Sequence, residues 1–386
     1  MASGPVCTPT TGPDATYCEC HRPEEAVKAI VYHGPGDVRI EDRQEPEPGP
    51  GQILVRVATA GICGTDVAEF VHQPHFFPIE DPHPHSGHLG PTVPGHEFSG
   101  WVAAAGPDVT GFDQGDLVAV GAGVSCGACS PCLAGNTNLC ISYWTVGLHG
   151  DGGLAELAVV PVSSALSLAN SAITPDLAAL AQPMSIGVHA TRRARVTEGD
   201  RVVVLGVGGI GTFIVRAAAS AGADVTAVDL DPNRLEVARR LGASTTLDVS
   251  AIGIDELDED RPPDVVFECT GRPESLIRGV SLVADHGRLV VVGHQPEPVA
   301  VDFRQIALDE LELIGTQAHA IATDLPVAVD LITADPGIWA VVAPTVYPLD
   351  QVVETGLIPM ARGDAGQIKM LFDPAVQAPR PLDTGD

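Results

Sequence analysis

The sequence predicts an α/β protein of two domains, the first mainly β and the second built on a parallel sheet. At 386 residues the chain is longer than one hydrophobic core usually organises. From residue 26 to about 160, short apolar blocks are broken by Gly and Pro, which is typical of strands. After about residue 190, strand-like runs alternate with helical patterns, and this alternation favours βαβ units.

In the first domain, strands are expected where apolar blocks alternate with polar residues or run continuously. These blocks read KAIVYH, QILVRVATAG, FSGWVAAAG and DLVAVGA in chain order. Helical periodicity is weak in this region, so the domain is predicted to be mainly β. The segments at 347–349 and 368–372 are predicted to return to this domain at the end of the chain.

The second domain is expected to begin with a buried strand over 201–205 (RVVVL). Apolar residues then recur at helical spacing, and Gly222 is a suitable C-terminal stop for that helix. The helix positions are Ile210, Phe213, Ile214, Ala217, Ala218 and Ala221. The remaining strands are expected at 224–228, 264–267, 288–292 and 311–314.

Four cysteines are crowded into the stretch CGACSPCLAGNTNLC, at spacings x2, x2 and x7. Tetrahedral zinc takes four thiolates at about 2.3 Å, and short Cys-x2-Cys steps let one turn supply several of them. Buried free cysteines or a disulfide pair are the alternatives, and x2 cysteines bridge poorly. A closed four-thiolate site is structural, with a binding energy on the order of 10–16 kcal/mol in small zinc modules. The predicted ligands are Cys126, Cys129, Cys132 and Cys140.

The composition excludes several classes of partner. A net charge of −29 argues against nucleic acid and anionic membranes, because phosphate binding needs clustered Lys and Arg. Only two lysines are present, Lys28 and Lys369, and such an acidic composition suits either a high-salt cytoplasm or a GC-rich genome. No run of eighteen apolar residues predicts a membrane helix, and the start of the chain lacks a signal-peptide pattern, so a cytoplasmic location is expected.

Residues 1–25 are rich in Pro, Thr and Gly and are predicted to be a disordered extension. Cys7, Cys18, Cys20 and His21 lie there, so a metal site is the alternative to a functionally silent tail.

A glycine-rich turn follows the strand at 201–205 and opens the predicted helix. A Gly-x-Gly-x-x-Gly pattern alone is weak, but a preceding strand and a following helix are the context that a dinucleotide site requires. The glycines allow a tight turn, approach of the backbone to a pyrophosphate and close helix packing. The cofactor residues predicted here are Gly206, Gly208, Gly209, Ile210 and Gly211.

Asp229 ends the second strand of this unit, and a carboxylate there accepts hydrogen bonds from an adenosine ribose. It would also repel a 2′-phosphate, and no basic residue immediately follows it, so NAD(H) is predicted over NADP(H). Arg234 either lies over the same ribose or is a solvated arginine at the start of a helix.

Two further motifs lie in the β-rich domain: Gly61-Ile-Cys63-Gly-Thr65-Asp66 and Gly95-His96-Glu97. Together with the cysteine cluster and the glycine-rich turn, they resemble the zinc-dependent medium-chain alcohol dehydrogenase superfamily from about Lys28 to Pro374. The insert at 77–92 and the stretch GLHGDGG at 147–153 are most similar to the polyol and 2,3-butanediol dehydrogenase branch.

The resemblance implies a GroES-like β-rich catalytic domain and a Rossmann doubly wound parallel-sheet domain that binds NAD. We expect the catalytic domain over 26–187 and 335–386, with the structural zinc lobe at 126–140, and the NAD-binding domain over 188–334. It also implies two zinc ions per chain and a homodimer or homotetramer.

The resemblance assigns roles residue by residue. Cys63 and His96 match catalytic zinc ligands, and Glu97 matches a glutamate that either ligates the metal or stands behind it. Thr65 matches the hydroxyl that receives the substrate proton. Thr270 and Val292 are expected near the cofactor. An open zinc acts as a Lewis acid on the alcohol, and the nicotinamide accepts the hydride.

Two residues depart from the pattern of this branch. Gln182 stands where a glutamate is usual, so the predicted zinc site carries less negative charge, and we expect weaker zinc retention. Ala68 stands where a histidine often relays the proton, so Glu69, His72 or water is left to do so. The histidines around the insert, which are His72, His75, His83, His85 and His88, are expected to form a solvated loop, with a third metal site as the alternative.

These observations favour an NAD-dependent zinc dehydrogenase that acts on a secondary alcohol, a vicinal diol or a polyol. A threonine-type or aldehyde-dismutating dehydrogenase is the alternative within enzymes. From a different class, the chain could be a catalytically impaired NAD-binding sensor or assembly protein, and Gln182 and Ala68 keep that alternative open.

Overall fold

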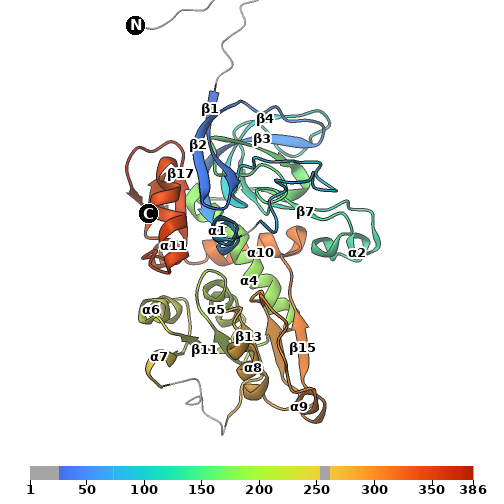
Figure 1. The fold of residues 1–386 in the computed structure, drawn as a ribbon, viewed down its shortest axis with the longest axis vertical. Coiled ribbons are helices and arrows are strands. Elements are labelled where there is room, and N and C mark those ends of the chain that lie inside the picture. Colours follow the sequence, from blue (N-terminus) through green and yellow to red (C-terminus); the bar gives the residue numbers. More distant parts are fainter. Residues whose placement is uncertain (1–25, 73, 253–260, 386) are drawn as a thin grey trace, which may run out of the picture.

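The computed structural model describes residues 26–72, 74–252 and 261–385, and these form an upper and a lower part (Figure 1). The predicted disordered extension at 1–25, with its four candidate metal ligands, lies outside the described residues. Helices α4 (Ala181–Arg193) and α10 (Ile321–Thr333) pack together between the two parts.

The lower part contains a six-stranded parallel sheet in the order β12-β11-β10-β13-β14-β15. After β10, the strands β11 and β12 are added on one side of the sheet, and β13, β14 and β15 are added on the other. The direction of strand addition therefore changes between β10 and β13, as in doubly wound nucleotide-binding folds. The sequence prediction of a parallel sheet is confirmed, and strand β10 has the predicted limits. The strands are β10 (Arg201–Leu205), β11 (Asp224–Asp229), β12 (Thr245–Asp248), β13 (Val265–Glu268), β14 (Arg288–Val291) and β15 (Glu312–Gly315).

Helices cover both faces of this sheet because alternate residues of its strands point in opposite directions. Val202 and Val204 of β10 belong to one buried cluster, which includes Phe213 of the first helix. Val203 and Leu205 belong to another, on the opposite face. The helices of this part are α5 (Gly211–Ser220), α6 (Pro232–Arg240), α7 (Val249–Ile252), α8 (Pro273–Leu282) and α9 (Phe303–Leu308).

The upper part is built around an eight-stranded mixed sheet in the order β18-β16-β17-β3-β4-β5-β9, with β8 also paired to β3. The C-terminal strand β17 pairs with β3, so the end of the chain returns to this part. The strands are β3 (Gln52–Ile62), β4 (Glu97–Ala105), β5 (Leu117–Val120), β8 (Leu157–Pro161), β9 (Ala165–Ser167), β16 (Thr345–Pro348), β17 (Met370–Asp373) and β18 (Arg380–Pro381).

Two two-stranded antiparallel sheets and several short helices complete the upper part. These sheets pair β1 (Ala26–Gly34) with β2 (Asp37–Gln44), and β6 (Gly123–Val124) with β7 (Trp144–Thr145). The short helices are α1 (Gly64–Val71), α2 (Ser130–Leu133), η1 (Thr137–Leu139), η2 (Val162–Ser164), α3 (Pro175–Ala179), η4 (Pro336–Val341), η5 (Leu349–Gln351), η6 (Val352–Leu357) and α11 (Ile358–Arg362).

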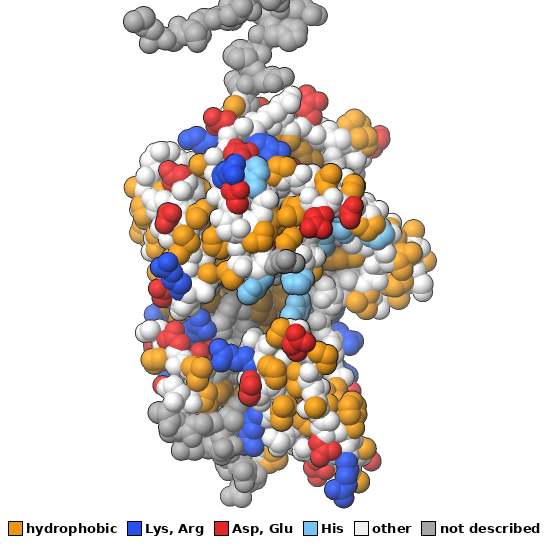
Figure 2. Space-filling view, viewed as in Figure 1, with side chains coloured by type: hydrophobic (Ala, Val, Ile, Leu, Met, Phe, Trp, Pro, Cys, Tyr) orange, Lys and Arg blue, Asp and Glu red, His pale blue; other side chains and the backbone are white. Residues whose placement is uncertain are grey.

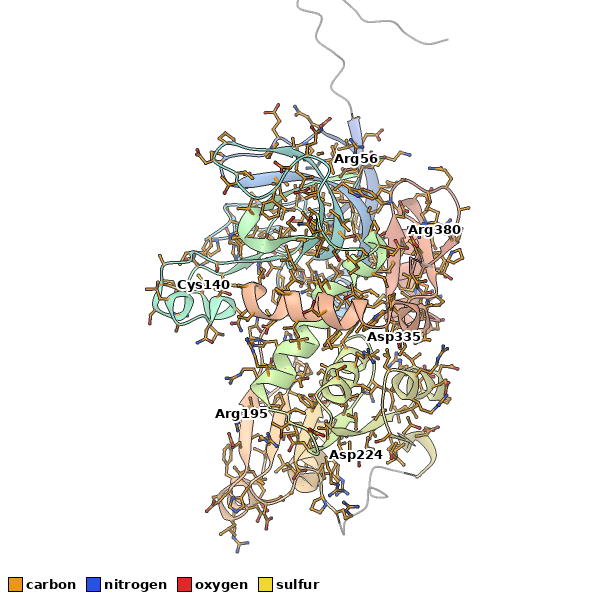
Figure 3. All side chains as sticks on the ribbon, turned by 180° about the vertical axis from the view of Figure 1, so that it is seen from behind. Arg56, Cys140, Arg195, Asp224, Asp335 and Arg380 are labelled. Atoms are coloured by element: carbon orange, nitrogen blue, oxygen red, sulfur yellow. The ribbon has the colours of Figure 1, made fainter. Side chains whose placement is uncertain are left out.

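The junction between the parts is a packed interface. Trp339 is fully buried, and its ring stacks on Phe213 of α5 with centroids 5.7 Å apart. Helix α4 runs continuously through the predicted boundary at 187/188, so the change of part takes place along a helix. Figure 3 shows this junction from behind, with Arg56 and Arg380 in the upper part and Arg195 and Asp224 in the lower. Among the described residues, no helix combines the length and the apolar character needed to cross a bilayer.

Candidate active site

Strand β3 leads directly into helix α1, and Cys63 lies at the turn between them. The Cys63 backbone N–H donates to Asp66 Oδ2 at 2.8 Å, which caps the first turn of the helix. Thr65 Oγ1 lies 3.8 Å from Cys63 Sγ. The end of the strand and the helix cap therefore place a thiol and a hydroxyl side by side.

His96 and Glu97 reach the same place from the neighbouring strand. Glu97 begins β4 and pairs with Gly61 of β3, and both His96 and Glu97 are buried. A Cβ on Gly61 would lie 2.9 Å from Glu97 Oε2. Glycine at position 61 therefore leaves the space that the glutamate side chain occupies.

Cys63, His96 and Glu97 each present a ligand atom, and these atoms all lie within 4.8 Å of one another. Asp66 Oδ1 and His96 Nδ1, which are 3.8 Å apart, are buried without a hydrogen-bond partner. Burial lowers the pKa of His96, but Asp66 and Cys63 outweigh it and raise that pKa to about 9. Several buried side chains here can carry a negative charge, and such a group favours the binding of a metal cation. A ligand set of one sulfur, one nitrogen and one oxygen atom suits zinc.

Lys369, just before β17, contacts this site but was not among the residues predicted from the sequence. Its ammonium group donates to Glu97 Oε1 at 2.6 Å and to the Ile62 carbonyl at 3.4 Å. The side chain of Lys369 is almost fully buried. The one signal in the sequence was its rarity, since Lys369 is one of two lysines in the chain.

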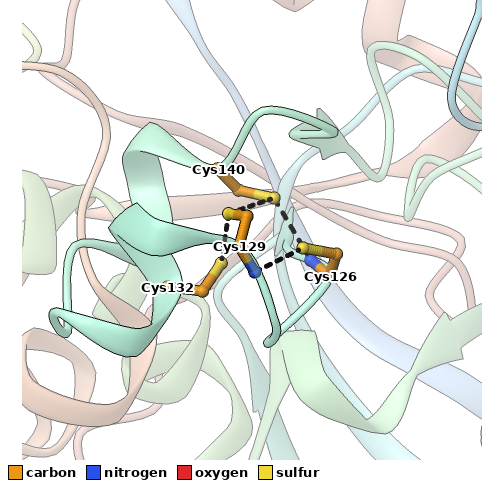
Figure 4. Close-up of side chains that lie close together, drawn as sticks. All are labelled: Cys126, Cys129, Cys132 and Cys140. Atoms are coloured by element: carbon orange, nitrogen blue, oxygen red, sulfur yellow. Dashed lines mark hydrogen bonds between the residues drawn. The ribbon is translucent and has the colours of Figure 1, made fainter.

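The four cysteines of the predicted structural site converge in a lobe that projects from the upper part (Figures 1 and 4). Cys129 Sγ lies 3.4 Å from Cys132 Sγ and 3.8 Å from Cys140 Sγ. These separations are far longer than a disulfide bond and suit four thiolates around one metal ion.

The backbone of this lobe favours thiolates. The backbone N–H of Cys126 and that of Ser142 both donate to Cys140 Sγ, at 3.2 and 3.3 Å. Backbone N–H groups, that of Ile141 first, lower the pKa of Cys129 to about 6. Burial and hydrogen bonding to Cys129 raise the pKa of Cys132 to about 11.

The glycine-rich turn joins β10 to α5. Gly206 has φ of +86°, and a Cβ there would lie 2.7 Å from Thr270 Cγ2. A Cβ on Gly211 would clash with the Gly206 carbonyl oxygen, so helix and turn pack closely. A Cβ on Gly209 would meet no atom within 4 Å, and one on Gly208 would meet only the Arg234 guanidinium, at 3.6 Å. The turn therefore has an open side at Gly208 and Gly209.

Asp229 ends β11 beside this turn. Its Oδ2 accepts the Val207 backbone N–H at 2.9 Å, and its Oδ1 accepts the N–H groups of Leu230 and Asp231. Arg234 Nη1 lies 3.9 Å from Asp229 Oδ1. The carboxylate is thus fixed at the end of the strand, next to the turn.

A pocket of about 230 Å³ lies between the two parts, where Figure 2 shows a hollow with histidine side chains at its edge. It brings together all five predicted catalytic residues and two predicted cofactor residues. They are Cys63, Thr65, His96, Glu97, Gln182, Ile210 and Val292.

The other predicted cofactor residues lie outside that pocket. Gly208, Gly209 and Arg234 line a neighbouring cavity of about 220 Å³ together with Lys369. The remaining ones, Gly206, Gly211, Asp229 and Thr270, line neither cavity. Thr270 donates from its backbone N–H and its hydroxyl to Glu268 Oε1.

The segment that leads into the insert forms part of the pocket wall. The carboxylate of Glu69, in α1, accepts the backbone N–H groups of His75 at 2.9 Å and Phe76 at 3.0 Å. Phe76 lines the pocket, as does His149 from the loop after β7. Sequence patterns did not identify Glu69 in this anchoring role, nor Phe76 and His149 as wall residues.

The alternative of a third metal site in the insert has no support in the described part of the chain. The groups there that could hold a metal are the four cysteines and the Cys63 set. His83 stacks instead on His149, with ring centroids 4.3 Å apart.

A larger cavity, of about 860 Å³, opens elsewhere on the upper part and is lined by Arg56, Trp101, Asp176 and Arg380 among others. None of its lining residues belongs to the metal-binding or glycine-rich sets, so cavity size alone does not locate the candidate site.

Comparison with known proteins gives matches over most of the chain. Residues 49–170 match the family model of the alcohol dehydrogenase GroES-like domain, and residues 209–334 match that of the zinc-binding dehydrogenase. Sorbitol dehydrogenase of Gallus gallus is 32% identical over 360 residues, which cover 91% of this chain and 98% of that protein.

Solved structures show the same architecture. The 2R,3R-butanediol dehydrogenase from Bacillus subtilis is 29% identical, with a TM-score of 0.82, over 90% of this chain and 99% of that chain. An alcohol dehydrogenase from Escherichia coli CFT073, complexed with NADH, is 28% identical, with a TM-score of 0.79, over the same shares of the two chains.

Proposed function

Because the chain belongs to the superfamily of zinc-dependent medium-chain alcohol dehydrogenases, in its polyol and butanediol branch, we propose that it transfers a hydride between NAD(H) and a secondary alcohol, vicinal diol or polyol. The observation that carries this proposal is the shared pocket: Cys63, His96 and Glu97 line the same cavity as Ile210 and Val292. The candidate zinc ligands and two of the predicted cofactor residues therefore line the same cavity.

Zinc held by Cys63, His96 and Glu97 would supply a Lewis acid that makes the substrate hydroxyl more acidic. The proposed acceptor of the substrate proton is Thr65, and its position beside Cys63 supports this role. Glu69 is an unsuitable relay from there, because its carboxylate already accepts the backbone N–H groups of His75 and Phe76. With Ala68 in the usual relay position, His72 or water is left to carry the proton to solvent.

The cofactor proposed is NAD(H). Asp229 holds its carboxylate at the end of β11 by three backbone hydrogen bonds, so it cannot easily turn away from a 2′-phosphate. Arg234 lies close enough to Asp229 to be partly neutralised by it. The open side of the turn at Gly208 and Gly209 suits the pyrophosphate.

The substrate proposed is uncharged. No Lys or Arg side chain lines the 230 Å³ pocket in the described part of the chain. Lys369 is nearby but pairs with Glu97. A carboxylate or phosphate on the substrate would lack a cationic partner from the protein, which favours neutral diols and polyols over a threonine-type substrate.

The proposed domain limits are those expected from the sequence, with the catalytic domain over 26–187 and 335–386 and the NAD-binding domain over 188–334. We also propose a homodimer or homotetramer. Strand β15 ends its sheet, and its Leu313 is 41% exposed, while Phe303 in α9 is 71% exposed. A cytoplasmic location is consistent with the free cysteines in the described residues.

A substrate panel tests the proposal. Purified protein with NAD⁺ and added zinc is offered secondary alcohols, vicinal diols, polyols and L-threonine, and NADH formation is followed by absorbance. Turnover of neutral diols or polyols is expected. The absence of NADH formation with every member of the panel would favour the NAD-binding sensor instead.

A further inference from the structure

His149 is a pocket residue whose ring is held by several neighbours. Its Nδ1 accepts the Thr145 backbone N–H at 3.0 Å, and its own backbone N–H donates to the Thr145 carbonyl at 2.8 Å. One face of the ring stacks on His83 at 4.3 Å, with an interplanar angle of 18°. Phe76 makes an edge contact, with centroids 6.0 Å apart. The imidazole therefore has a fixed orientation in the pocket wall.

These contacts also determine which ring nitrogen of His149 carries the hydrogen atom. A neutral imidazole that accepts at Nδ1 carries its hydrogen on Nε2, which then is a donor. Burial, with a contribution from His83, lowers the pKa of His149 to about 4, so the ring is neutral at pH 7. No acceptor for Nε2–H is found within the part of the chain that the structure describes, although His149 is half-buried.

The same pocket holds the candidate zinc ligands Cys63, His96 and Glu97. A substrate with one oxygen at that centre and a second oxygen on the adjacent carbon would carry a further acceptor into the pocket. We propose that His149 Nε2–H donates a hydrogen bond to this second oxygen, so that His149 selects vicinal diols and hydroxyketones over simple secondary alcohols. This inference rests on the proposed dehydrogenase function.

The selectivity would come from a hydrogen-bond donor that is left unpaired. A site built to hydrogen-bond a substrate hydroxyl rejects an analogue that lacks it, because the protein donor is then left unpaired. His149 is only half-buried, so water can partly replace the substrate oxygen. The expected selectivity is therefore moderate, about 10- to 100-fold, and below that of a fully closed site.

The test compares 2,3-butanediol with 2-butanol, which has the same carbon skeleton and lacks the second oxygen. His149→Phe keeps an aromatic ring for stacking and removes the donor, whereas His149→Gln keeps an N–H donor. The ratio of kcat/KM for the diol over the monoalcohol is expected to fall about 10- to 100-fold in H149F, mainly through KM, and less in H149Q. An unchanged ratio in folded H149F overturns the proposal.

A measurement on the wild-type protein covers the case in which the variants do not fold. The methyl ether 3-methoxy-2-butanol can accept but not donate a hydrogen bond at the second oxygen. It should retain much of the advantage of the diol over 2-butanol, and an ether as poor as 2-butanol contradicts the proposal. If the wild type oxidises none of the three but oxidises a polyol, only the inference fails. If it oxidises no compound of the full substrate panel, the proposed function fails and the inference fails with it. If it oxidises the diol and 2-butanol equally well, only the inference fails.

Discussion

The Lys369 ammonium donates a 2.6 Å hydrogen bond to the Glu97 carboxylate, and both side chains are almost completely buried. Burial lowers the pKa of Lys369, but the Glu97 carboxylate outweighs it and raises that pKa, so the lysine is charged. The pair balances one of the negative groups around Cys63 and His96. It therefore links zinc binding to the stability of the fold.

Replacement of Lys369 by methionine should destabilise the zinc-free protein more than the zinc-loaded protein. Without zinc, Glu97 becomes an unpaired buried carboxylate, which costs about 3–5 kcal/mol. With zinc, the metal supplies the opposite charge. We expect the increase in Tm on zinc addition to be larger in K369M than in the wild type. Lys28→Met, at the exposed second lysine, is the control and should match the wild type. An equal loss with and without zinc would argue against Glu97 facing the metal.

The four-cysteine lobe should lose zinc as the pH falls. Without metal, the Cys132 thiol has a pKa of about 11 and Cys129 a pKa of about 6. Zinc needs thiolates, so binding at pH 7 displaces the Cys132 proton, and affinity should fall about tenfold per pH unit. Below about pH 6 the fall should steepen, because Cys129 then also holds a proton.

Cys132→Ser should remove this zinc and lower the Tm, whereas Cys269→Ser should retain it. Zinc affinity measured by competition with a chelator across pH, together with the metal content of both variants, checks the prediction. An affinity that does not change with pH would contradict the assignment of Cys132 as a protonated ligand.

Asp229→Asn should relax the preference for NAD⁺. The amide keeps the size of the side chain and one acceptor for the backbone N–H groups, but it removes the negative charge that opposes a 2′-phosphate. We expect the ratio of kcat/KM for NAD⁺ over NADP⁺ to fall about tenfold. Asp248→Asn, at the end of the adjacent strand β12, is the matched control. If the two variants behave alike, Asp229 does not determine the choice of cofactor.

Glu69→Gln should loosen the wall of the pocket. The carboxylate accepts the backbone N–H groups of His75 and Phe76, and an amide nitrogen turned toward them would leave at least one unpaired. We expect a loss of about 1–3 kcal/mol in the free energy of unfolding and a higher KM for the diol. Glu80→Gln, at an exposed position of the insert that follows, should change neither quantity. A wild-type KM in E69Q would mean that Phe76 is held by other contacts.

Local patterns predicted the features that depend on a few successive residues. The strand over 201–205, the glycine-rich turn and the four cysteines each lie within a short segment, so spacing alone defines their geometry. Glu97 and Lys369, which pair in the structure, are 272 positions apart in the sequence. No periodic pattern in the sequence indicates such a pairing. Phe76 and His149 likewise meet only because two loops fold over one pocket. Sequence patterns for that reason could not show that these two side chains share the wall of the pocket.

The most direct test of the central claim is a zinc titration of the chelator-stripped enzyme, followed by NADH formation from NAD⁺ and 2,3-butanediol. Gln182 is neutral and lines the catalytic pocket, so the zinc of Cys63, His96 and Glu97 should be held more weakly than that of the cysteine lobe. We predict that the first equivalent per chain raises the Tm without activity and that NADH formation follows the second. Full activity with one zinc or none, or no activity with two, would contradict the account.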